Sequence, residues 1–564
     1  MPPRPFPRKT VNAEPPRRVP NAVRRFWVAE AATGERREIV ARLRVQTPHI
    51  AMWVEEDVWH DVRQLLEAAE LLGGHTYPRL RDAFGSEWSP GVDNDPRIHV
   101  LHATGLGKHV LGYTSAIDEY RKDVHPQSNE AEMITVNVDR VDVGSPVYRA
   151  LLARQFQRLV QWNLDRNEER WVKEGLAELA AALSGFDVVQ PRQAYLKQTD
   201  TSLTAWTDSE SQRGAVYLFM AHFHQRFGDP GTRILTAEPA DGTRGFDAAL
   251  ETLGTNLAFE DLLADWLAAN FIDSTPGLEG PRHSYSALDM ERPLVTSFQE
   301  PYPVDTLESV EQFGADYIIL QGDSDLHLRF VGRTETPLFS VSPRAGQPTW
   351  WSNRADASLT TLTRGFDLTD VAAPALAYSL WYDLEAYYDY ASVEVSDDQG
   401  ENWHILYTPL GTGADPHGNS PGWGYTGRSG GWIREQVDLS EHAGQDVLVR
   451  FSCLTDEAIT DEGLLVSGIT LIGVDDRIVG GTSTDDWSPR GFVLTDGVVS
   501  QRYLVLVIGI GEETSVERLP LREDQTGEWT VPLGREGPRQ AVLVISAMAP
   551  LTAQAASYQL SISR

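Results

Sequence analysis

The change in hydrophobic pattern near residue 290 constrains the fold of this 564-residue chain more than any other feature. Before it, segments such as 57–84 carry apolar residues at helical spacing, with short strand-like segments between them. After it, strand patterns recur between turns such as Asp397-Asp398-Gln399-Gly400. We therefore expect a mixed α and β domain first, followed by all-β domains of the jelly-roll or sandwich type.

Length and local composition predict where the domains begin and end. At about 150 residues per domain, three to four domains are expected. Residues 1–21 hold seven prolines and predict a flexible, basic arm over 1–25. A stretch rich in Gly, Thr and Asp at 479–487 precedes the last strand patterns. The other predicted domains are a mixed α and β domain over 26–290, a β jelly-roll module over 291–478 and a C-terminal β-sandwich over 479–564.

The charge of the chain limits its partners. The 49 Lys and Arg stand against 81 Asp and Glu, and the net charge of −32 disfavours binding to nucleic acid or to an anionic membrane. The single cysteine, Cys453, excludes a disulfide framework and a cysteine-built zinc site. No apolar run reaches the roughly 18 residues of a membrane helix. Residues 1–25 lack the apolar stretch of a signal peptide, so either the protein stays inside the cell or its biological start is not Met1.

Two strong helical patterns lie in the first half of the chain. Ser145-Pro146 predicts the start of a helix that runs to about Trp162, because serine caps helices and proline suits their first position. A second helix is expected from about Glu168 to Leu183, ending before Gly185. Further helices are expected near 212–227 and 258–271.

The first of these helices is apolar enough to be buried, yet it carries Arg154 and Arg158 one turn apart. An unpaired buried guanidinium is unfavourable. The second helix carries Glu174 and Glu178, also one turn apart. We therefore expect an ion-pair cluster between the two helices; the alternative is that both arginines extend to solvent.

This helix pair resembles the active-site region of the immune inhibitor A-like secreted metallopeptidases. That family carries His-Glu-x-x-His on the first helix and Trp-Val-Asn-Glu-Gly-Leu-x-Glu on the second, which here reads Trp171-Val172-Lys173-Glu174-Gly175-Leu176-Ala177-Glu178. In the family motif two histidines and the first glutamate of the second helix hold zinc, and the glutamate after the first histidine is the general base. The resemblance implies a zincin-like fold for residues 26–290 and an extracellular or cell-envelope protein.

The sequence departs from that motif at the functional positions. The first histidine corresponds to Arg154, the general base to Gln155 and the second histidine to Arg158; only the third ligand is retained, as Glu174. A guanidinium offers no lone pair to zinc, and glutamine does not accept a proton as a carboxylate does. The resemblance therefore implies a lost zinc site with no intact catalytic residue, in which the arginine–glutamate cluster replaces zinc as the link between the helices.

The remaining histidines do not suggest another metal site. His99 and His102 lie three apart on a strand pattern and should point to opposite faces. His222 and His224 lie two apart on a helical pattern, about 200° around the helix. We expect each of them to be an ordinary core or surface histidine.

The β region resembles the jelly-roll module of the same family, and with it the resemblance spans most of residues 26–564. Its motifs occur in the family's order: Trp350-Trp351-Ser352-Asn353-Arg354, Trp381-Tyr382-Asp383-Leu384-Glu385, Gly430-Gly431-Trp432 and Val449-Arg450-Phe451. Such modules often bind calcium, and Asp383, Glu385, Asp389 and Asp456 supply oxygen donors near turns. The acidic pair that the family carries before the module's last strand is replaced here by Val466-Ser467-Gly468-Ile469. Calcium therefore stays open against solvated turn residues.

Aromatic residues in the β region allow two interpretations. Tyr387, Tyr388, Trp423, Tyr425 and Trp432 would either line a glycan or protein contact or fill the core of a sandwich.

The function expected from these features is that of a catalytically inactive homologue of a secreted zinc metallopeptidase, binding a peptide, protein or glycan ligand that the sequence does not identify. One alternative is an active zinc endopeptidase with an atypical ligand set. Another is a structural module of the cell surface. Bound zinc would separate the active enzyme from the other two.

Overall fold

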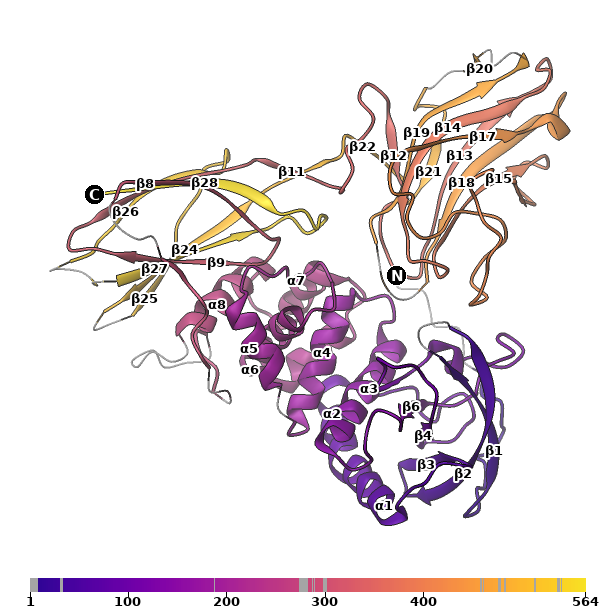
Figure 1. Ribbon diagram of the computed structural model, residues 1–564, viewed down its shortest axis with the longest axis horizontal. Coiled ribbons are helices and arrows are strands. Elements are labelled where there is room, and N and C mark those ends of the chain that lie inside the picture. Colours follow the sequence, from indigo (N-terminus) through magenta and orange to yellow (C-terminus); the bar gives the residue numbers. More distant parts are fainter. Residues whose placement is uncertain are drawn as a thin grey trace. The chain divides into compact units, whose positions relative to one another are not determined.

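The computed structural model describes residues 9–30, 34–186, 188–272, 282–286, 288, 290–297, 302–456, 459, 461–474, 478–480, 483–511, 514–534, 538 and 540–564. The chain divides into two compact units. Unit 1 comprises Met1–Thr336 and Ser500–Arg564, and unit 2 comprises Pro337–Val499. A mixed α and β region at the start and β-sheets in the rest confirm the expected multidomain class (Figure 1).

A mixed sheet forms the first part of unit 1, with the strand order β1-β2-β3-β4-β6-β5. Strands β3, β4 and β6 are parallel, and the other neighbours are antiparallel. Alternation along β3 sends Met52 to the face covered by helices and Trp53 to the opposite core. The strands are β1 (Val23–Ala29), β2 (Arg36–Gln46), β3 (Ile50–Glu55), β4 (Ile98–Ala103), β5 (Gly112–Tyr113) and β6 (Met133–Asn137).

Helices cover one face of this sheet and continue into a helical layer (Figure 1). Helix α3 begins as predicted, since Ser145 Oγ accepts a hydrogen bond from the Tyr148 amide and Pro146 is its first residue. Two helices, α5 and α7, were not predicted, and α6 changes direction at Gly228, whose φ is 63°. The helices are α1 (Val62–Leu71), a π-helical turn η1 (Leu72–Thr76), α2 (Tyr77–Phe84), a short 3₁₀ helix η2 (Ala116–Glu119), α3 (Pro146–Leu164), α4 (Arg170–Leu183), α5 (Val189–Lys197), α6 (Glu210–Thr236), α7 (Gly242–Thr252) and α8 (Phe259–Ile272).

A β-sandwich completes unit 1 and joins segments far apart in the chain. One sheet has the order β26-β10-β28-β8 and the other β25-β24-β27-β9-β7, and both contribute to one core. The second sheet also packs on the helical layer, where the Tyr317 hydroxyl donates a hydrogen bond to the Leu267 carbonyl at 2.7 Å. The strands are β7 (Thr296–Ser297), β8 (Val304–Val310), β9 (Asp316–Gln321), β10 (Leu326–Gly332), β24 (Tyr503–Ile510), β25 (Ser515–Arg518), β26 (Thr526–Val531), β27 (Gln540–Ala547) and β28 (Ala556–Ser563).

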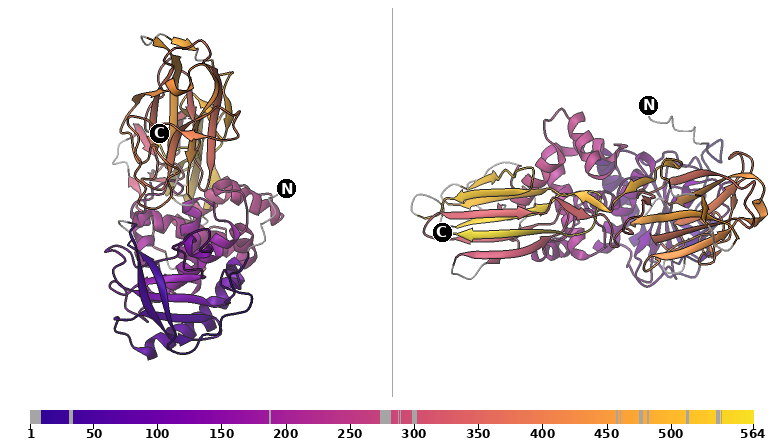
Figure 2. Two further views of the ribbon diagram at one scale, coloured as in Figure 1. Left: turned by 90° about the vertical axis from the view of Figure 1, so that its right-hand side faces the viewer. Right: turned by 90° about the horizontal axis from the view of Figure 1, so that it is seen from above.

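This pairing differs from the expected boundaries at residues 290 and 478. Strand β10 lies between β26 and β28, so residues 304–332 share a sandwich with residues 503–563 (Figure 2). Unit 2 is inserted between these two segments in the sequence. The alternating pattern of a strand shows that one face is buried but does not show which strand lies beside it, so a contiguous domain was expected where the fold is discontinuous.

Unit 2 is itself a sandwich of two sheets around one core. One sheet has the order β17-β14-β19-β12-β22, with β20 beside β19, and the other β16-β15-β18-β13-β21. The elements are β12 (Thr349–Trp351), β13 (Leu359–Asp367), β14 (Ala375–Asp383), β15 (Tyr390–Ser396), β16 (His404–Ile405), β17 (Ile433–Asp438), a 3₁₀ turn η3 (Ser440–His442), β18 (Asp446–Leu454), β19 (Gly463–Ile472), β20 (Ile478–Gly480), β21 (Ser488–Arg490) and β22 (Val493–Thr495). Strands β11 (Glu335–Pro337) and β23 (Val498–Ser500) form a separate two-stranded ladder.

The predicted arm at residues 1–25 is ordered in its described part. The Val11 amide donates a hydrogen bond to the Val92 carbonyl at 2.7 Å, and Arg18 forms ion pairs with Asp93 and Asp95. Strand β1 already begins at Val23. Proline content predicted flexibility, but these long-range contacts hold residues 9–25 on the rest of unit 1.

In the part of the chain that the structure describes, no helix combines the length and the apolar character needed to cross a membrane.

Candidate functional site

Helices α3 and α4 bring the four predicted charged residues into two ion pairs. Nε and Nη2 of Arg154 donate to Oε2 of Glu178 at 2.9 and 2.6 Å. Nη2 of Arg158 donates to Oε2 of Glu174 at 2.6 Å. On each helix the two charged residues lie four apart and therefore on one face, so two successive turns of α3 are each linked to a turn of α4.

Two further arginines complete this site and were not predicted. Nε of Arg170, at the start of α4, lies 3.8 Å from Oε1 of Glu174, and Nη1 of Arg213, on α6, lies 3.7 Å from Oε1 of Glu178. We call Arg154, Arg158, Arg170 and Arg213 the arginine cluster. The i, i+4 spacing of Arg170 and Glu174 was a usable signal, whereas nothing in the sequence linked α6 to α4.

The charges of the site form two layers. The side chains of Glu178 and Glu174 are 3% and 7% exposed, and those of the four arginines are between 26% and 35% exposed. Burial by itself disfavours the ionised form of Glu174, but Arg158 and Arg170 outweigh it and hold the pKa of Glu174 below its ordinary value. Both carboxylates are therefore compensated from within the chain, and guanidinium groups form the outer layer.

The residues at this site do not fit zinc. Arg154 and Arg158 offer only N–H donors, and both oxygens of Glu174 face arginines. Gln155 is 7% exposed, and its Oε1 accepts no hydrogen bond from the described residues. One carboxylate already bound by two cations is not the set of three neutral or anionic ligands that a catalytic zinc requires.

His99 and His102 point to opposite faces of the sheet, as predicted. Nδ1 of His99 accepts a hydrogen bond from Trp53 Nε1 at 2.9 Å on one side of the sheet. Nδ1 of His102 donates to the Trp53 carbonyl, and its Nε2 accepts from the Tyr148 hydroxyl of α3. His222 and His224 contact the Arg282 carbonyl and Thr232 Oγ1, respectively. Burial lowers the pKa of His102 and of His222 to about 4, so both are neutral at physiological pH.

A second group of ionisable side chains, not predicted from the sequence, lies beneath the N-terminal segment. Asp93, Asp95 and His99 place possible ligand atoms within 4.8 Å of one another. Arg18 bridges the two carboxylates at 2.9 and 3.1 Å, and Arg97 binds Asp95 at 2.7 Å. Guanidinium groups therefore already compensate these carboxylates.

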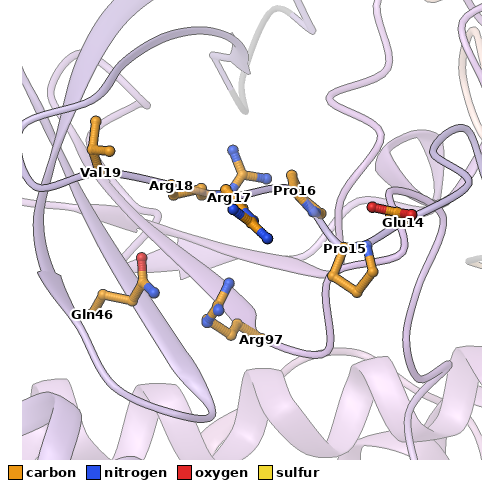
Figure 3. A pocket seen from close by; sticks show the side chains of 8 residues that line it. All are labelled: Glu14, Pro15, Pro16, Arg17, Arg18, Val19, Gln46 and Arg97. Atoms are coloured by element: carbon orange, nitrogen blue, oxygen red, sulfur yellow. The ribbon is translucent and has the colours of Figure 1, made fainter.

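Figure 3 shows the cavity of about 650 Å³ beside this group, where Arg17, Arg18 and Arg97 lie near Gln46. None of the cavity's lining residues belongs to α3 or α4. This cavity is thus separate from the arginine cluster.

Three of the four predicted calcium ligands come together in unit 2. Oxygens of Glu385, Asp389 and Asp456 lie within 4.8 Å of one another, and we call these residues the acidic cluster. Asp383 does not belong to it: its Oδ1 accepts a hydrogen bond from Arg428 at 2.6 Å instead. Asp383 ends strand β14, whereas the other three residues lie in the turns before β15 and after β18, so inclusion of Asp383 was wrong.

The acidic cluster differs electrostatically from the α3–α4 site. Burial, followed by repulsion from Asp456, raises the pKa of Asp389 to about 7. Asp389 forms no ion pair with Arg or Lys among the described residues. The three carboxylates together supply the oxygen donors that calcium prefers.

The five aromatic residues singled out from the sequence divide between core and surface. Tyr425 is buried, with its hydroxyl 2.8 Å from that of Tyr378, and Trp432 packs on a small apolar cluster. Tyr387 is exposed. Tyr388 stacks on His417 and Trp423 packs on Tyr407 at the partly exposed surface. A continuous aromatic surface made by all five is therefore not present.

A comparison with protein families identifies unit 2. Residues 331–497 match the family described as immune inhibitor A-like, MAM domain. The chain is related to the immune inhibitor A-like proteins. This match covers unit 2 and does not include α3 and α4, where the resemblance stands on the residues quoted above.

Individual relatives are similar over part of the chain. The chain is 29% identical over 160 residues to pre-pro-metalloprotease PrtV of Vibrio cholerae serotype O1, covering 28% of this chain and 17% of PrtV. It is 29% identical over 171 residues to immune inhibitor A of Bacillus thuringiensis subsp. alesti, covering 29% of this chain and 23% of that protein. It is 28% identical over 96 residues to bacillopeptidase F of Bacillus subtilis, covering 17% and 6%. The matched segments span less than a quarter of each relative.

Proposed function

We propose that this immune inhibitor A-like protein is catalytically inactive and acts outside the cell by binding a peptide or protein segment at its zincin-like domain. One observation carries the proposal. The two positions that hold histidine ligands in the family motif are Arg154 and Arg158, and each is engaged with a glutamate of α4. The expected extracellular location follows from the metalloprotease relatives and is part of the proposal.

The arrangement around α3 supports a zincin-like frame. The sheet ends in the short antiparallel strand β5 next to the parallel strands β6 and β4. Helix α3 packs close to this edge. A Cβ atom added to Gly112 of β5 would lie only 3.0 Å from Cδ2 of Leu151 on α3. Helix α4 packs beside α3 and presents Glu174 to it. These contacts support the proposal of a peptidase-like frame in which the side chains needed for hydrolysis have been replaced.

The first test is the zinc content per chain of the protein purified without a chelator, measured by elemental analysis. We expect less than about one tenth of an equivalent per chain, because the site lacks ligands. A value near one equivalent would overturn the proposal and favour an active endopeptidase with an unusual ligand set.

A second test rebuilds the family motif. The triple variant Arg154→His, Gln155→Glu and Arg158→His restores two ligands and the base beside Glu174. We expect it to bind about one zinc per chain, while the same variant with Glu174→Gln binds far less. If the folded triple variant binds no zinc, the zincin-like frame is not present and the proposal fails at that step.

We further propose that the acidic cluster of unit 2 binds calcium. This proposal rests on the approach of three carboxylates and on the raised pKa of Asp389. The residues fit the ion, since hard oxygen donors from turns are its usual ligands. Bound calcium would hold together the turns before β15 and after β18, so its role would be structural.

A further inference from the structure

We infer that the arginine cluster binds an acidic segment of a peptide or protein through carboxylate groups. This inference rests on the proposed function and specifies the chemical class of its ligand. The site contains more guanidinium groups than its own carboxylates need. These groups also lie outside the buried carboxylates.

The number of arginines exceeds what the buried glutamates require. Arg154 binds Glu178 and Arg158 binds Glu174 at 2.6 Å, so two arginines already pair the two carboxylates. Arg170 and Arg213 approach the same glutamates only to 3.8 and 3.7 Å. Among the described residues, the other acidic partner is Asp208, which pairs with Arg213 and is more than half exposed. Four positive charges therefore face three negative ones, and the exposed pair is weak.

Some N–H groups of the arginine cluster also donate no hydrogen bond within the described residues. A guanidinium has five N–H groups in a planar fork. Within the described residues, Arg158 donates one hydrogen bond, through Nη2, and the Nη1 groups of Arg154 and Arg158 donate none. The four side chains are about one-quarter to one-third exposed, so the arginine cluster is partly open to solvent. Carboxylates match the guanidinium fork with two parallel hydrogen bonds, which favours a ligand rich in Asp or Glu.

The acidic character of the whole chain does not oppose this. The net charge is −32, but charges more than about 8 Å from the site are largely screened at physiological ionic strength. Because of the local excess of arginine, the site binds negatively charged groups. The remote acidic residues slow the approach of an acidic ligand. We therefore expect binding with a modest association rate and a marked dependence on salt.

The experiment uses the full chain and three fluorescein-labelled peptides of equal length, in which alanine alternates with Glu, Ser or Lys. Binding is measured by fluorescence anisotropy at low and at physiological salt. We expect the Glu peptide to bind at least about tenfold more tightly than the Ser peptide and the Lys peptide not to bind. Each peptide is made with a free and with an amidated C-terminus, which separates side-chain carboxylates from a terminal one.

The matched variant replaces Arg170 and Arg213 by Gln, because each glutamate then keeps its nearest arginine. We expect about a tenfold or greater loss of affinity for the Glu peptide in a variant whose thermal unfolding shows that unit 1 is still folded. Arg63→Gln, an exposed arginine on α1, is the control and should bind as the unchanged protein does.

Each outcome decides one claim. Equal affinities for the Glu and Ser peptides, or no binding of the Glu peptide, would overturn the inference. The proposed inactivity would still stand in that case if the protein contains no zinc. Cleavage of any peptide would overturn the proposed function. If the Gln variant is folded and binds the Glu peptide as tightly as the control does, the ligand does not sit on the arginine cluster.

Discussion

Two groups of carboxylates in this protein have opposite electrostatic surroundings. In unit 1, Glu174 and Glu178 are surrounded by arginines, and the pKa of Glu174 is lowered. In unit 2, Asp389 lies beside Glu385 and Asp456, and its pKa is raised to about 7. The arginines around Glu174 favour its ionised form, whereas burial and the neighbouring Asp456 disfavour the ionised form of Asp389. The proposed calcium site and the α3–α4 site therefore differ in the charges that surround their buried carboxylates.

The same contrast applies to zinc and calcium, the two metals that the family resemblance implies. At the two positions that correspond to histidine ligands in the family motif the chain carries Arg154 and Arg158, whose positive charge would repel an added metal ion. At the acidic cluster three of the four expected oxygen ligands remain together. The predictions below test this contrast, beginning with the largest expected effect.

Breaking the α3–α4 link should have the largest effect. Arg154→Ala removes two hydrogen bonds and leaves the buried Glu178 with Arg213 at 3.7 Å as its remaining cation. We expect the free energy of unfolding of unit 1 to fall by about 3 kcal/mol, measured by calorimetry and urea titration. Arg63→Ala should change it by less than about 0.5 kcal/mol.

A double variant sharpens that result. Replacing Arg154 by Met and Glu178 by Leu removes both charges and keeps an apolar contact. Because no charge is then left buried, most of the lost stability should return. If the double variant is as unstable as Arg154→Ala, packing rather than charge explains the loss.

Calcium should stabilise unit 2 by a comparable amount. At a calcium concentration about a hundredfold above the dissociation constant, the free energy of unfolding should rise by about 2.7 kcal/mol. Calorimetry with and without a chelator measures this shift. Asp389→Asn should abolish it, and Asp383→Asn should retain it, since Asp383 pairs with Arg428 outside the cluster. A shift of equal size in both variants would place the ion elsewhere.

The two clusters should also respond to pH with opposite signs. For Asp389 the folded pKa is about 7 and lies above the unfolded value, so the folded state binds more protons between about pH 4 and 7. Without calcium, the stability of unit 2 should therefore fall as the pH rises through this range. Asp389→Asn should remove this slope, and saturating calcium should suppress it. An unchanged slope in the variant would assign it to another group.

The smallest effect is expected from Glu174. Its folded pKa lies below the unfolded value, so its stabilisation is present above the unfolded pKa and is lost as the pH falls through the folded one. As the pH falls from about 5 to about 3, unit 1 should lose more stability than the Glu174→Gln variant does. Chemical denaturation over this range, with Glu67→Gln on the exposed face of α1 as control, measures the difference.

Much of the α3–α4 site could be predicted because its signals are local. A serine cap, a helix-starting proline and pairs of charges four residues apart are set by helix geometry, which repeats over neighbouring residues. Arg213 escaped prediction because it reaches Glu178 from α6, and no local rule relates residues 35 positions apart. The group of Arg18, Asp93, Asp95 and His99 was missed for the same reason, since Arg18 lies 75 positions from Asp93.

The sequence by itself determined the helix pair and the change from mixed to β structure, because both follow from short-range periodicity. The loss of the zinc ligands stays a prediction from the residues at Arg154, Gln155 and Arg158. Only the tertiary structure decided that residues 304–332 share a sandwich with residues 503–563, that Asp383 stands apart from the acidic cluster, and that two more arginines reach the buried glutamates. These outcomes depend on which buried surfaces meet. That choice is made by the packing of segments distant in the chain, and a single sequence does not display it.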